Sequence, residues 1–430
     1  MIYTDIKNDF KFNNENLQVS PTMVKKCFLE LIDGIMHYKK VLAKAEYENT
    51  GKPIECCNQE IDRCIFILKN CLNYYDEEKI FAVHEDDYAC VAKNQYLPIG
   101  NVLAFTPVSS PYSSVIHKLT ASLIFGNRFF WKPSKQAMMC SYELYSIIDC
   151  TINKNIKNSI NLIDIEDSEL RNLLEQDFYD CLLFTGSSSV AKTIKSYIGR
   201  RKAVFETGST ALCYISDKSN IAIDELVDNV LQAAFSQNGK RCIALKNLFI
   251  HEKIYDNFTS LLKSKIENHN KDLYGCVEYH IENSEKTDFI SNVRELINCG
   301  YEVFAKNKND FPIILVDKDL KKESIDEFFG PFLCLHRVTS YRDISENYYS
   351  VSTLSTSIFS EDKVEIEEFI SCCSDCGMVC VNFGPNKRFD SLPFGGFQNE
   401  NENKESLGSL KSILTKHQIV IEKVGKEFIV

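Results

Sequence analysis

The feature of this sequence that most restricts its fold is a strand–loop–helix–strand segment near residue 110. Val102–Phe105 predicts a short apolar strand, Ser114–Phe125 a helix, and Arg128–Trp131 the next strand. Gly126-Asn127 ends the helix as a C-terminal cap does. Strands joined through a helix run parallel, and parallel strands bind ligands beyond their carboxyl ends. The segment therefore predicts an α/β fold with functional loops after its strands.

Strands and helices alternate over most of the remaining chain. Apolar runs predict further strands at Leu162–Ile165, Cys181–Phe184, Leu212–Ile215, Leu245–Ile250, Thr356–Phe359 and Met378–Asn382, a strand pair between Phe81 and Asn101, and a strand-like tail at Ser409–Val424. Apolar residues at helical spacing predict helices at Pro21–Lys44, Ile54–Tyr75, Gln136–Asn153, Ser168–Gln176, Ile223–Phe235, Ile254–Glu267 and Val364–Cys376. Residues 268–325 give no clear pattern.

Length and charge limit the classes of protein to which the chain can belong. Its 430 residues are enough for two or three domains. A net charge of -11 argues against general binding to nucleic acid or to anionic membranes. No run of about 18 apolar residues occurs, so no membrane span is predicted. The polar N-terminal segment lacks the apolar core of a signal peptide, which predicts a cytoplasmic protein.

The 18 cysteines are predicted to be free thiols, because a long chain without a secretory signal points to a reducing compartment. Cys372, Cys373, Cys376 and Cys380 include a C-x-x-C pattern. A zinc site needs a second pair of ligands or well-placed histidines. A helix followed by a strand would separate these four thiols, so we predict structural cysteines and no metal.

A candidate nucleophile is Cys242, which follows Gly239-Lys240-Arg241. A thiolate attacks carbonyl carbon well, and neighbouring cations or a base favour its formation. Glu206, within Phe205-Glu206-Thr207-Gly208-Ser209, lies 36 residues earlier and is within reach if two elements fold back on each other. A cysteine beside basic residues is a weak signal alone, because most cysteines are small core residues.

Two polar segments follow predicted strands and are candidates for binding phosphate or ribose. Lys132-Pro133-Ser134 comes directly after one strand, and Thr185-Gly186-Ser187 stands between another strand and a helix. Backbone N–H groups at such a Gly-Ser turn can bind phosphate oxygens. The usual G-x-G-x-x-G dinucleotide fingerprint is absent.

Together, the motifs resemble the aldehyde dehydrogenase superfamily in order and spacing from about residue 21 to the end. The matching blocks are the Thr50-Gly51-Lys52-Pro53 turn between two helices, Trp131–Ser134, Phe184–Ser187, Glu206–Gly208, Gly239–Cys242, Asp326–Pro331 and Pro393–Gly396. The resemblance implies a Rossmann-type cofactor domain (1–208, with oligomerisation strands near 82–100), an α/β catalytic domain (209–396), and a return to the cofactor domain with a C-terminal oligomerisation strand (397–430). Within the superfamily, the sequences of these motifs are most similar to those of the glutamate-semialdehyde (pyrroline-5-carboxylate) dehydrogenase branch.

The resemblance also implies a role for each matching residue. Cys242 is then the nucleophile and Glu206 the general base, and NAD or NADP is the cofactor. The cofactor-binding residues implied in this way are Lys132, Ser134, Lys135, Gly186, Ser187, Gly208, Glu327 and Phe329. A small aldehyde or semialdehyde is the implied substrate, and a homo-dimer or tetramer the implied assembly.

Three departures from the family pattern concern catalysis and cofactor choice. Ser109 stands where the family has an asparagine that stabilises the oxyanion, and loss of such a donor costs on the order of 10²-fold or more in rate. Lys135 replaces a glutamate that grips the adenosine ribose, which favours a 2′-phosphate. The Gly-rich turn that the family usually has after the preceding strand is missing, and the acidic segment Asp164–Asp167 stands in its place. Acidic side chains near the adenosine disfavour a 2′-phosphate, so the choice between NAD and NADP stays open.

Two alternative functions follow from the same fold. One passes the acyl group to coenzyme A, or runs in reverse as an acyl-thioester reductase. Glu206 argues against it, because a base that activates water endangers the thioester. The other is a non-catalytic binding protein. The missing oxyanion asparagine and the missing Gly-rich turn favour this alternative, whereas the retained Cys242, Glu206, Lys132 and Glu327 oppose it.

Overall fold

The structure of the chain is a computed structural model. It describes residues 21–74, 82–87, 90–152, 154–267, 283–306, 311–317, 329–352, 354–389, 392–396 and 407–423. The chain divides into two compact units: unit 1 comprises Met1–Ala45, Asn58–Phe205 and Glu405–Val430, and unit 2 comprises Glu46–Cys57 and Glu206–Lys404. The division thus falls just before Glu206, whereas the sequence placed it after residue 208.

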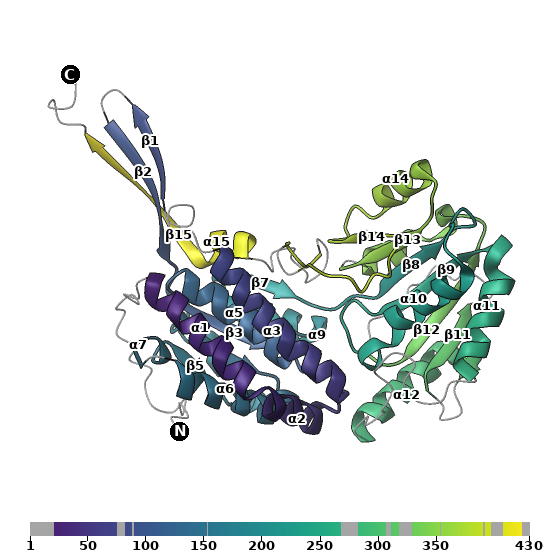
Figure 1. Cartoon of the computed structure of the whole chain (residues 1–430), viewed down its shortest axis with the longest axis horizontal. Coiled ribbons are helices and arrows are strands. Elements are labelled where there is room, and N and C mark those ends of the chain that lie inside the picture. The colour runs from purple at the N-terminus through teal and green to yellow at the C-terminus, as the bar shows by residue number, and fades with distance from the viewer. Residues whose placement is uncertain are drawn as a thin grey trace. The chain divides into compact units, whose positions relative to one another are not determined.

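Unit 1 is built on a five-stranded sheet in the order β5-β4-β3-β6-β7 (Figure 1). Its strands are β3 (Asn101–Thr106), β4 (Arg128–Pro133), β5 (Ile160–Leu162), β6 (Cys181–Thr185) and β7 (Lys202–Glu206). The pairs β3–β4, β3–β6 and β4–β5 are parallel. The strand–helix–strand prediction is therefore confirmed, and its helix is α5 (Pro111–Ile124).

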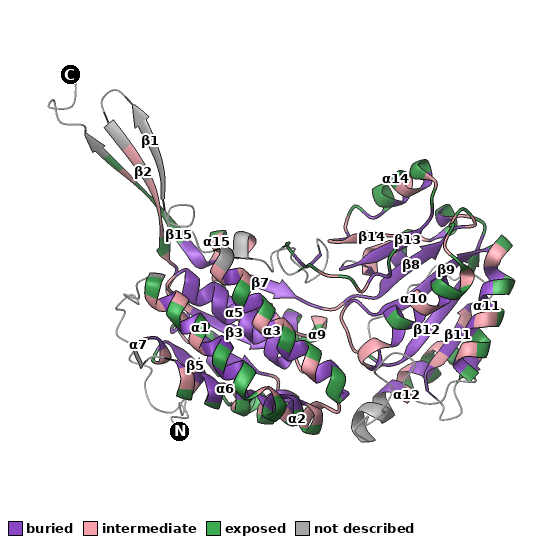
Figure 2. Cartoon of the chain, viewed as in Figure 1, coloured by how far each residue is buried: buried purple, intermediate pink, exposed green. Residues whose placement is uncertain are grey.

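Helices cover both faces of this sheet. The face of α8 and α9 is packed with aliphatic and aromatic side chains such as Leu103, Phe130 and Phe184. The helices that lie wholly or partly in unit 1 are α1 (Pro21–His37), α2 (Lys39–Thr50), α3 (Ile54–Tyr74), α6 (Met138–Thr151), α7 (Lys154–Lys157), α8 (Leu170–Glu175), α9 (Ser188–Lys195) and α15 (Leu407–Leu414). Figure 2 shows that the strands between them are buried.

A second sheet of unit 1 has the order β1-β2-β15 and is antiparallel. Its strands are β1 (Ala82–Asp87), β2 (Cys90–Pro98) and β15 (Thr415–Lys423). The backbone N–H of Ile99 donates to the carbonyl of Leu414 at 3.0 Å, which ties the base of this sheet to α15. The predicted strand pair near residues 82–100 is therefore confirmed.

Unit 2 is built on a seven-stranded sheet in the order β10-β11-β12-β9-β8-β13-β14. Its strands are β8 (Ala211–Ile215), β9 (Leu245–His251), β10 (Glu302–Lys306), β11 (Ile313–Asp317), β12 (Phe332–Val338), β13 (Thr356–Phe359) and β14 (Val379–Val381). All neighbours are parallel except β10 and β11. Its helices are α10 (Ile223–Phe235), α11 (Glu252–Glu267), α12 (Asn283–Asn298), α13 (Glu346–Val351) and α14 (Lys363–Cys372).

Three predictions of local structure were wrong or incomplete. The helix predicted at Pro21–Lys44 is interrupted at Tyr38, between α1 and α2. The tail predicted as a strand begins with the helix α15, because Leu410 and Leu414, one helical turn apart, are both buried. Residues 283–317, which gave no pattern, contain α12, β10 and β11.

Among the described residues, no helix is long and apolar enough to cross a membrane. The sixteen cysteines whose side chains the structure describes are all free thiols. In that part of the chain, no group of three or more histidine, cysteine or acidic side chains could hold a metal ion. Burial raises the pKa of Cys373 to about 12 and that of Cys376 to about 11, so both thiols stay protonated at neutral pH.

Candidate active site

In unit 1, several predicted site residues lie at the carboxyl edge of the five-stranded sheet. Phe105 of β3 is in register with Lys132 of β4 and with Phe184 of β6. The loops that follow these strands therefore leave the sheet at the same edge. Ser109 is half-buried in the loop between β3 and α5. This is the edge at which parallel sheets bind ligands.

Lys132 has a buried side chain, exposed by 7%. Its ammonium lies 3.9 Å from the carboxylate of Asp167 and 6.0 Å from the ring centroid of Phe105. Burial lowers the pKa of Lys132, and the charge of Asp167 opposes this effect. A cation held in this way at the end of a strand is suited to donating hydrogen bonds to ribose hydroxyls.

Lys135 follows half-buried Ser134, in a short 3₁₀ turn before α6. Its ammonium forms an ion pair with the carboxylate of Glu166, and this hydrogen bond raises the pKa of Lys135. Both side chains are exposed, so the pair contributes little to stability. Lys135 favours NADP and the acidic segment that contains Glu166 favours NAD. These two features therefore lie in direct contact and offset each other's charge.

The Gly186-Ser187 turn joins β6 to α9. The Ser187 hydroxyl caps the helix by accepting a hydrogen bond from the N–H of Val190 at 3.4 Å. A Cβ atom on Gly186 would lie 2.6 Å from the Phe184 ring, so a larger residue does not fit without moving that ring. The turn thus places a glycine and a capped helix N-terminus together, as phosphate binding requires.

Lys118, which was not among the predicted site residues, lies beside this turn. Lys118 is buried on α5, and its ammonium donates to the hydroxyl of Thr185 at 2.6 Å. The signal in the sequence was a single lysine within the apolar helix Pro111–Ile124. Buried lysines are rare unless they are paired, and Lys118 is paired with Thr185.

Glu206 is the last residue of β7 and the point at which the chain enters unit 2, and both Glu206 and Cys242 precede neighbouring strands of the seven-stranded sheet. Glu206 lies five residues before Ala211, the start of β8, and Cys242 lies three residues before Leu245, the start of β9. Ala211 and Leu245 are register partners in a parallel pair, so both approach segments reach the same, amino-terminal edge of the sheet. Glu206 is buried, and Cys242 is partly exposed. Gly208, also partly buried, lies in the segment between Glu206 and β8.

The turn before Cys242 has an unusual backbone. Gln237, Asn238 and Gly239 have φ angles of 53°, 57° and 65°, three consecutive residues in the left-handed region. Each non-glycine residue in this conformation costs about 1–2 kcal/mol. Asparagine and glycine tolerate it best, which explains the Asn-Gly sequence here.

Side-chain packing around Cys242 and a hydrogen bond from Arg241 hold the thiol-bearing turn in place. Cys242 packs against a small buried cluster of Ile243, Leu354 and Phe394. The guanidinium of Arg241 donates to the carbonyl of Asn386 at 3.2 Å. The loop that contains Phe394 therefore supports the thiol-bearing turn.

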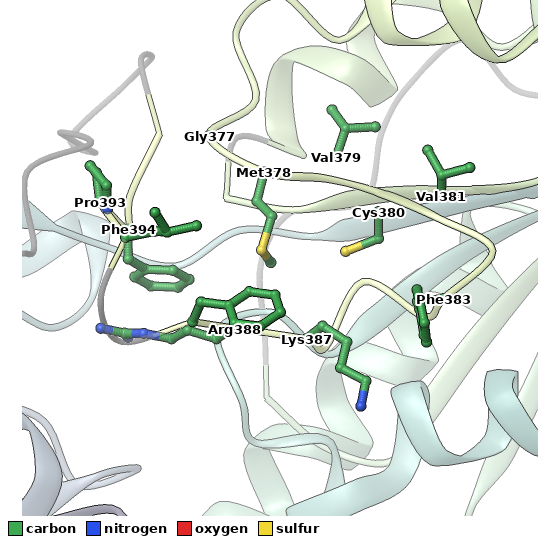
Figure 3. A pocket seen from close by; sticks show the side chains of 12 residues that line it. Gly377, Met378, Val379, Cys380, Val381, Phe383, Lys387, Arg388, Pro393 and Phe394 are labelled. Carbon is green, nitrogen blue, oxygen red and sulfur yellow. The ribbon is translucent and has the colours of Figure 1, made fainter. Parts of the chain in front are cut away.

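That loop encloses a pocket with β14 (Figure 3). The pocket has a volume of about 490 Å³, and its lining residues fall between Gly377 and Phe394 in the sequence. Figure 3 shows the sulfur atoms of Met378 and Cys380 on one side and the ring of Phe394 on the other. Gly377 is required here, because a Cβ atom on it would lie 1.6 Å from the carbonyl oxygen of Gly395.

Of the two residues predicted to contact the nicotinamide, one can be located. Phe329 is 42% exposed and directly precedes Gly330 at the amino-terminal side of β12. Glu327 lies outside the described residues. The Gly330 N–H donates to the Gly239 carbonyl at 3.4 Å, so the Phe329 segment contacts the thiol-bearing turn directly.

Residues 13–409 match the pattern of the aldehyde dehydrogenase family. The chain belongs to this family. Its members oxidise aldehydes with NAD or NADP, so the predicted activity and cofactors are confirmed at the level of the family. The predicted glutamate-semialdehyde branch is not confirmed.

Relatives of this aldehyde dehydrogenase act on several small aldehydes. It is 26% identical over 417 residues to a lactaldehyde dehydrogenase of Methanococcus aeolicus, covering 94% of this chain and 88% of the relative. It is 25% identical over 323 residues to a sulfoacetaldehyde dehydrogenase of Neptuniibacter caesariensis, covering 72% and 69%.

Solved structures confirm the predicted fold. The glyceraldehyde-3-phosphate dehydrogenase of Methanocaldococcus jannaschii, complexed with NADP, superimposes with a TM-score of 0.84 at 21% identity, covering 95% of this chain and 91% of the other. An aldehyde dehydrogenase of Physcomitrella patens in complex with succinate gives a TM-score of 0.84 at 20% identity, covering 95% and 88%.

Proposed function

We propose that this aldehyde dehydrogenase oxidises a short polar aldehyde to its acid, with Cys242 as nucleophile and Glu206 as general base. The observation that carries the proposal is the register of β8 and β9, which brings the approach segments of both residues to one edge of one sheet. The names of the relatives, lactaldehyde and sulfoacetaldehyde dehydrogenases, support a small hydroxylated or anionic substrate.

The residues present suit acyl chemistry on the thiol. The Cys242 thiolate attacks the carbonyl carbon to give a thiohemiacetal, and loss of hydride leaves a thioester on the same sulfur. Glu206 then removes a proton from the water that hydrolyses the thioester. The Cys242 N–H and the Ser109 hydroxyl are the proposed donors to the oxyanion, with Ser109 in the role that an asparagine has elsewhere in the family.

The carboxyl edge of the unit 1 sheet fits a dinucleotide. We assign the adenosine ribose to Lys132 and Ser134, with the Lys135–Glu166 pair beside it, and the pyrophosphate to Gly186 and Ser187. Gly208, Glu327 and Phe329 keep their proposed places at the nicotinamide end. The bound nicotinamide supplies the hydride acceptor for the reaction. The steric limit at Gly186 and the buried ammonium of Lys132 are the structural support for this assignment.

The role of Glu206 predicts turnover without coenzyme A and a specific defect in Glu206→Gln. Purified protein is given lactaldehyde, sulfoacetaldehyde and other short aldehydes with NAD or NADP, with and without coenzyme A. The unsubstituted enzyme should form reduced cofactor without coenzyme A. Glu206→Gln should keep the first, rapid burst and slow the steady state by a factor of about 10²–10⁴, because only hydrolysis needs the base.

A matched control for this experiment is Glu225→Gln, which removes an exposed carboxylate in the first turn of α10. It should leave both phases unchanged. Strict dependence on coenzyme A would instead support the acyl-transfer alternative. Equal slowing of burst and steady state in Glu206→Gln would contradict the assignment of this residue to hydrolysis.

We infer that the enzyme forms a homo-dimer or tetramer through its sheet edges. β15 is the edge strand of the three-stranded sheet, and its Ile419 and Ile421 are 68% and 67% exposed. β14 is an edge strand of the seven-stranded sheet. Exposed apolar edges are sites of pairing with another chain. The sixteen free thiols further support a cytoplasmic, reducing location.

Charges placed on the β15 edge should prevent this association. The double substitution Ile419→Lys and Ile421→Lys is expected to shift the protein to monomer in sedimentation velocity measurements, because two buried ammonium groups would oppose strand pairing. Val364→Lys, at a 64% exposed position on the helix α14, is the control and should not change the assembly. An unchanged sedimentation coefficient in the double variant would contradict the edge-strand interface.

A further inference from the structure

Lys246 is a buried cation on the strand that follows the catalytic turn. It is the second residue of β9, its side chain is 3% exposed, and its neighbours Leu245 and Leu248 are fully buried. Its ammonium donates to the carbonyl of Gly239 at 3.0 Å and to the carbonyl of Gly330 at 2.5 Å. It also lies 4.4 Å from the ring centroid of Phe332. A buried ammonium is costly unless it is hydrogen-bonded, so these two acceptors account for its presence.

The two carbonyls belong to segments whose backbones approach each other closely at these two glycines. Gly239 and Gly330 both have positive φ angles, 65° and 142°. A Cβ atom on Gly239 would lie 2.3 Å from the carbonyl oxygen of Gly330, so the close approach excludes any side chain there. The Gly330 N–H donates to Gly239 at 3.4 Å, a long hydrogen bond. The shorter bonds from Lys246 are therefore the stronger link between the segments.

Each segment leads to a group with a proposed part in the reaction. Gly239 precedes the nucleophile Cys242 by three residues, and Gly330 directly follows Phe329, the proposed contact of the nicotinamide. We propose that Lys246 is a positioning residue that joins these two segments and so sets where the thiol lies relative to the nicotinamide. This inference rests on the proposed function.

Lys246→Met is expected to separate two activities that share the thiol. Methionine keeps the apolar stem but leaves both carbonyls without the ammonium donor. Oxidation of the best aldehyde, followed as the burst of reduced cofactor, should fall by about tenfold to 10²-fold, because small misplacements of reacting groups cost rates of this size. Hydrolysis of p-nitrophenyl acetate needs the thiol and Glu206 but no cofactor, and it should stay within about threefold of the unsubstituted rate.

The dissociation constant of NADH, measured by fluorescence, should also rise in Lys246→Met, and this readout needs no turnover. Lys253→Met, which removes an exposed lysine at the start of α11, is the control and should change none of the three quantities. If Lys246→Met fails to fold, Lys246→Arg serves instead. It keeps the charge and the donors but displaces the carbonyls, and it should show the same separation at smaller size.

Parallel loss of aldehyde oxidation and ester hydrolysis, or loss of neither, would overturn the positioning role, since a purely structural lysine affects both alike. If the unsubstituted protein oxidises no aldehyde in the panel, the proposed function fails. The positioning role of Lys246 is then tested by NADH binding alone. An unchanged dissociation constant of NADH in Lys246→Met would overturn that role.

Discussion

Cys242→Ala is expected to abolish aldehyde oxidation while leaving cofactor affinity nearly unchanged. Alanine removes the sulfur that forms both covalent intermediates, and loss of a nucleophile of this kind costs on the order of 10⁴-fold or more in turnover. The residues assigned to the adenosine and pyrophosphate lie in unit 1, so binding of NADH should persist. Reduced-cofactor formation and NADH fluorescence measure the two quantities separately.

The matched control is Cys299→Ala, which removes an exposed thiol after the end of α12 and should retain full activity. The comparison matters because the chain has 18 cysteines. Substantial oxidation by Cys242→Ala would show that another group attacks the substrate.

Gly239→Ala is expected to have a large effect although it touches no reacting atom. The added Cβ would lie 2.3 Å from the carbonyl oxygen of Gly330 and 3.0 Å from that of Ala234, both of them backbone atoms. The left-handed φ of 65° adds about 1–2 kcal/mol for a residue other than glycine. We expect a loss of stability of about 2–4 kcal/mol and a fall in activity of about 10²-fold or more, because the thiol-bearing turn must move.

Gly199→Ala provides a control that separates backbone strain from steric overlap. Gly199 has a similar φ of 62°, but nothing lies within 4 Å of its Cβ position. This variant should lose about 1 kcal/mol of stability and keep its activity. Thermal unfolding and the rate of aldehyde oxidation check both variants. Equal tolerance of the two substitutions would refute the close contact between Gly239 and Gly330.

Gly239→Ala tests the dependence of the site on backbone contacts between distant segments. Gly239 and Gly330 are 91 positions apart in the sequence, and Gly377 and Gly395 form a second contact of this kind. In both pairs, a Cβ atom would meet a backbone carbonyl that cannot rotate away. The thiol-bearing turn and the loop around Phe394 are therefore held by backbone approach as well as by side-chain packing.

Local sequence determined the elements of this protein where one pattern dominated. The apolar runs at Leu212–Ile215 and Leu245–Ile250 predicted strands, and the helix Ile223–Phe235 was predicted with the bounds that the structure has. The order and spacing of the motifs were enough to indicate the family, since residue types at fixed distances along the chain are readable without coordinates.

Tertiary structure alone decided which distant groups meet. Strand register placed the approach segments of Glu206 and Cys242 at one sheet edge, although 36 positions separate them. The ion pair of Lys135 with Glu166 and the bonds from Lys246 to two glycine carbonyls involve partners that no local pattern names. Propensity and periodicity act over a few residues, whereas these contacts depend on how strands are ordered and how closely their loops approach.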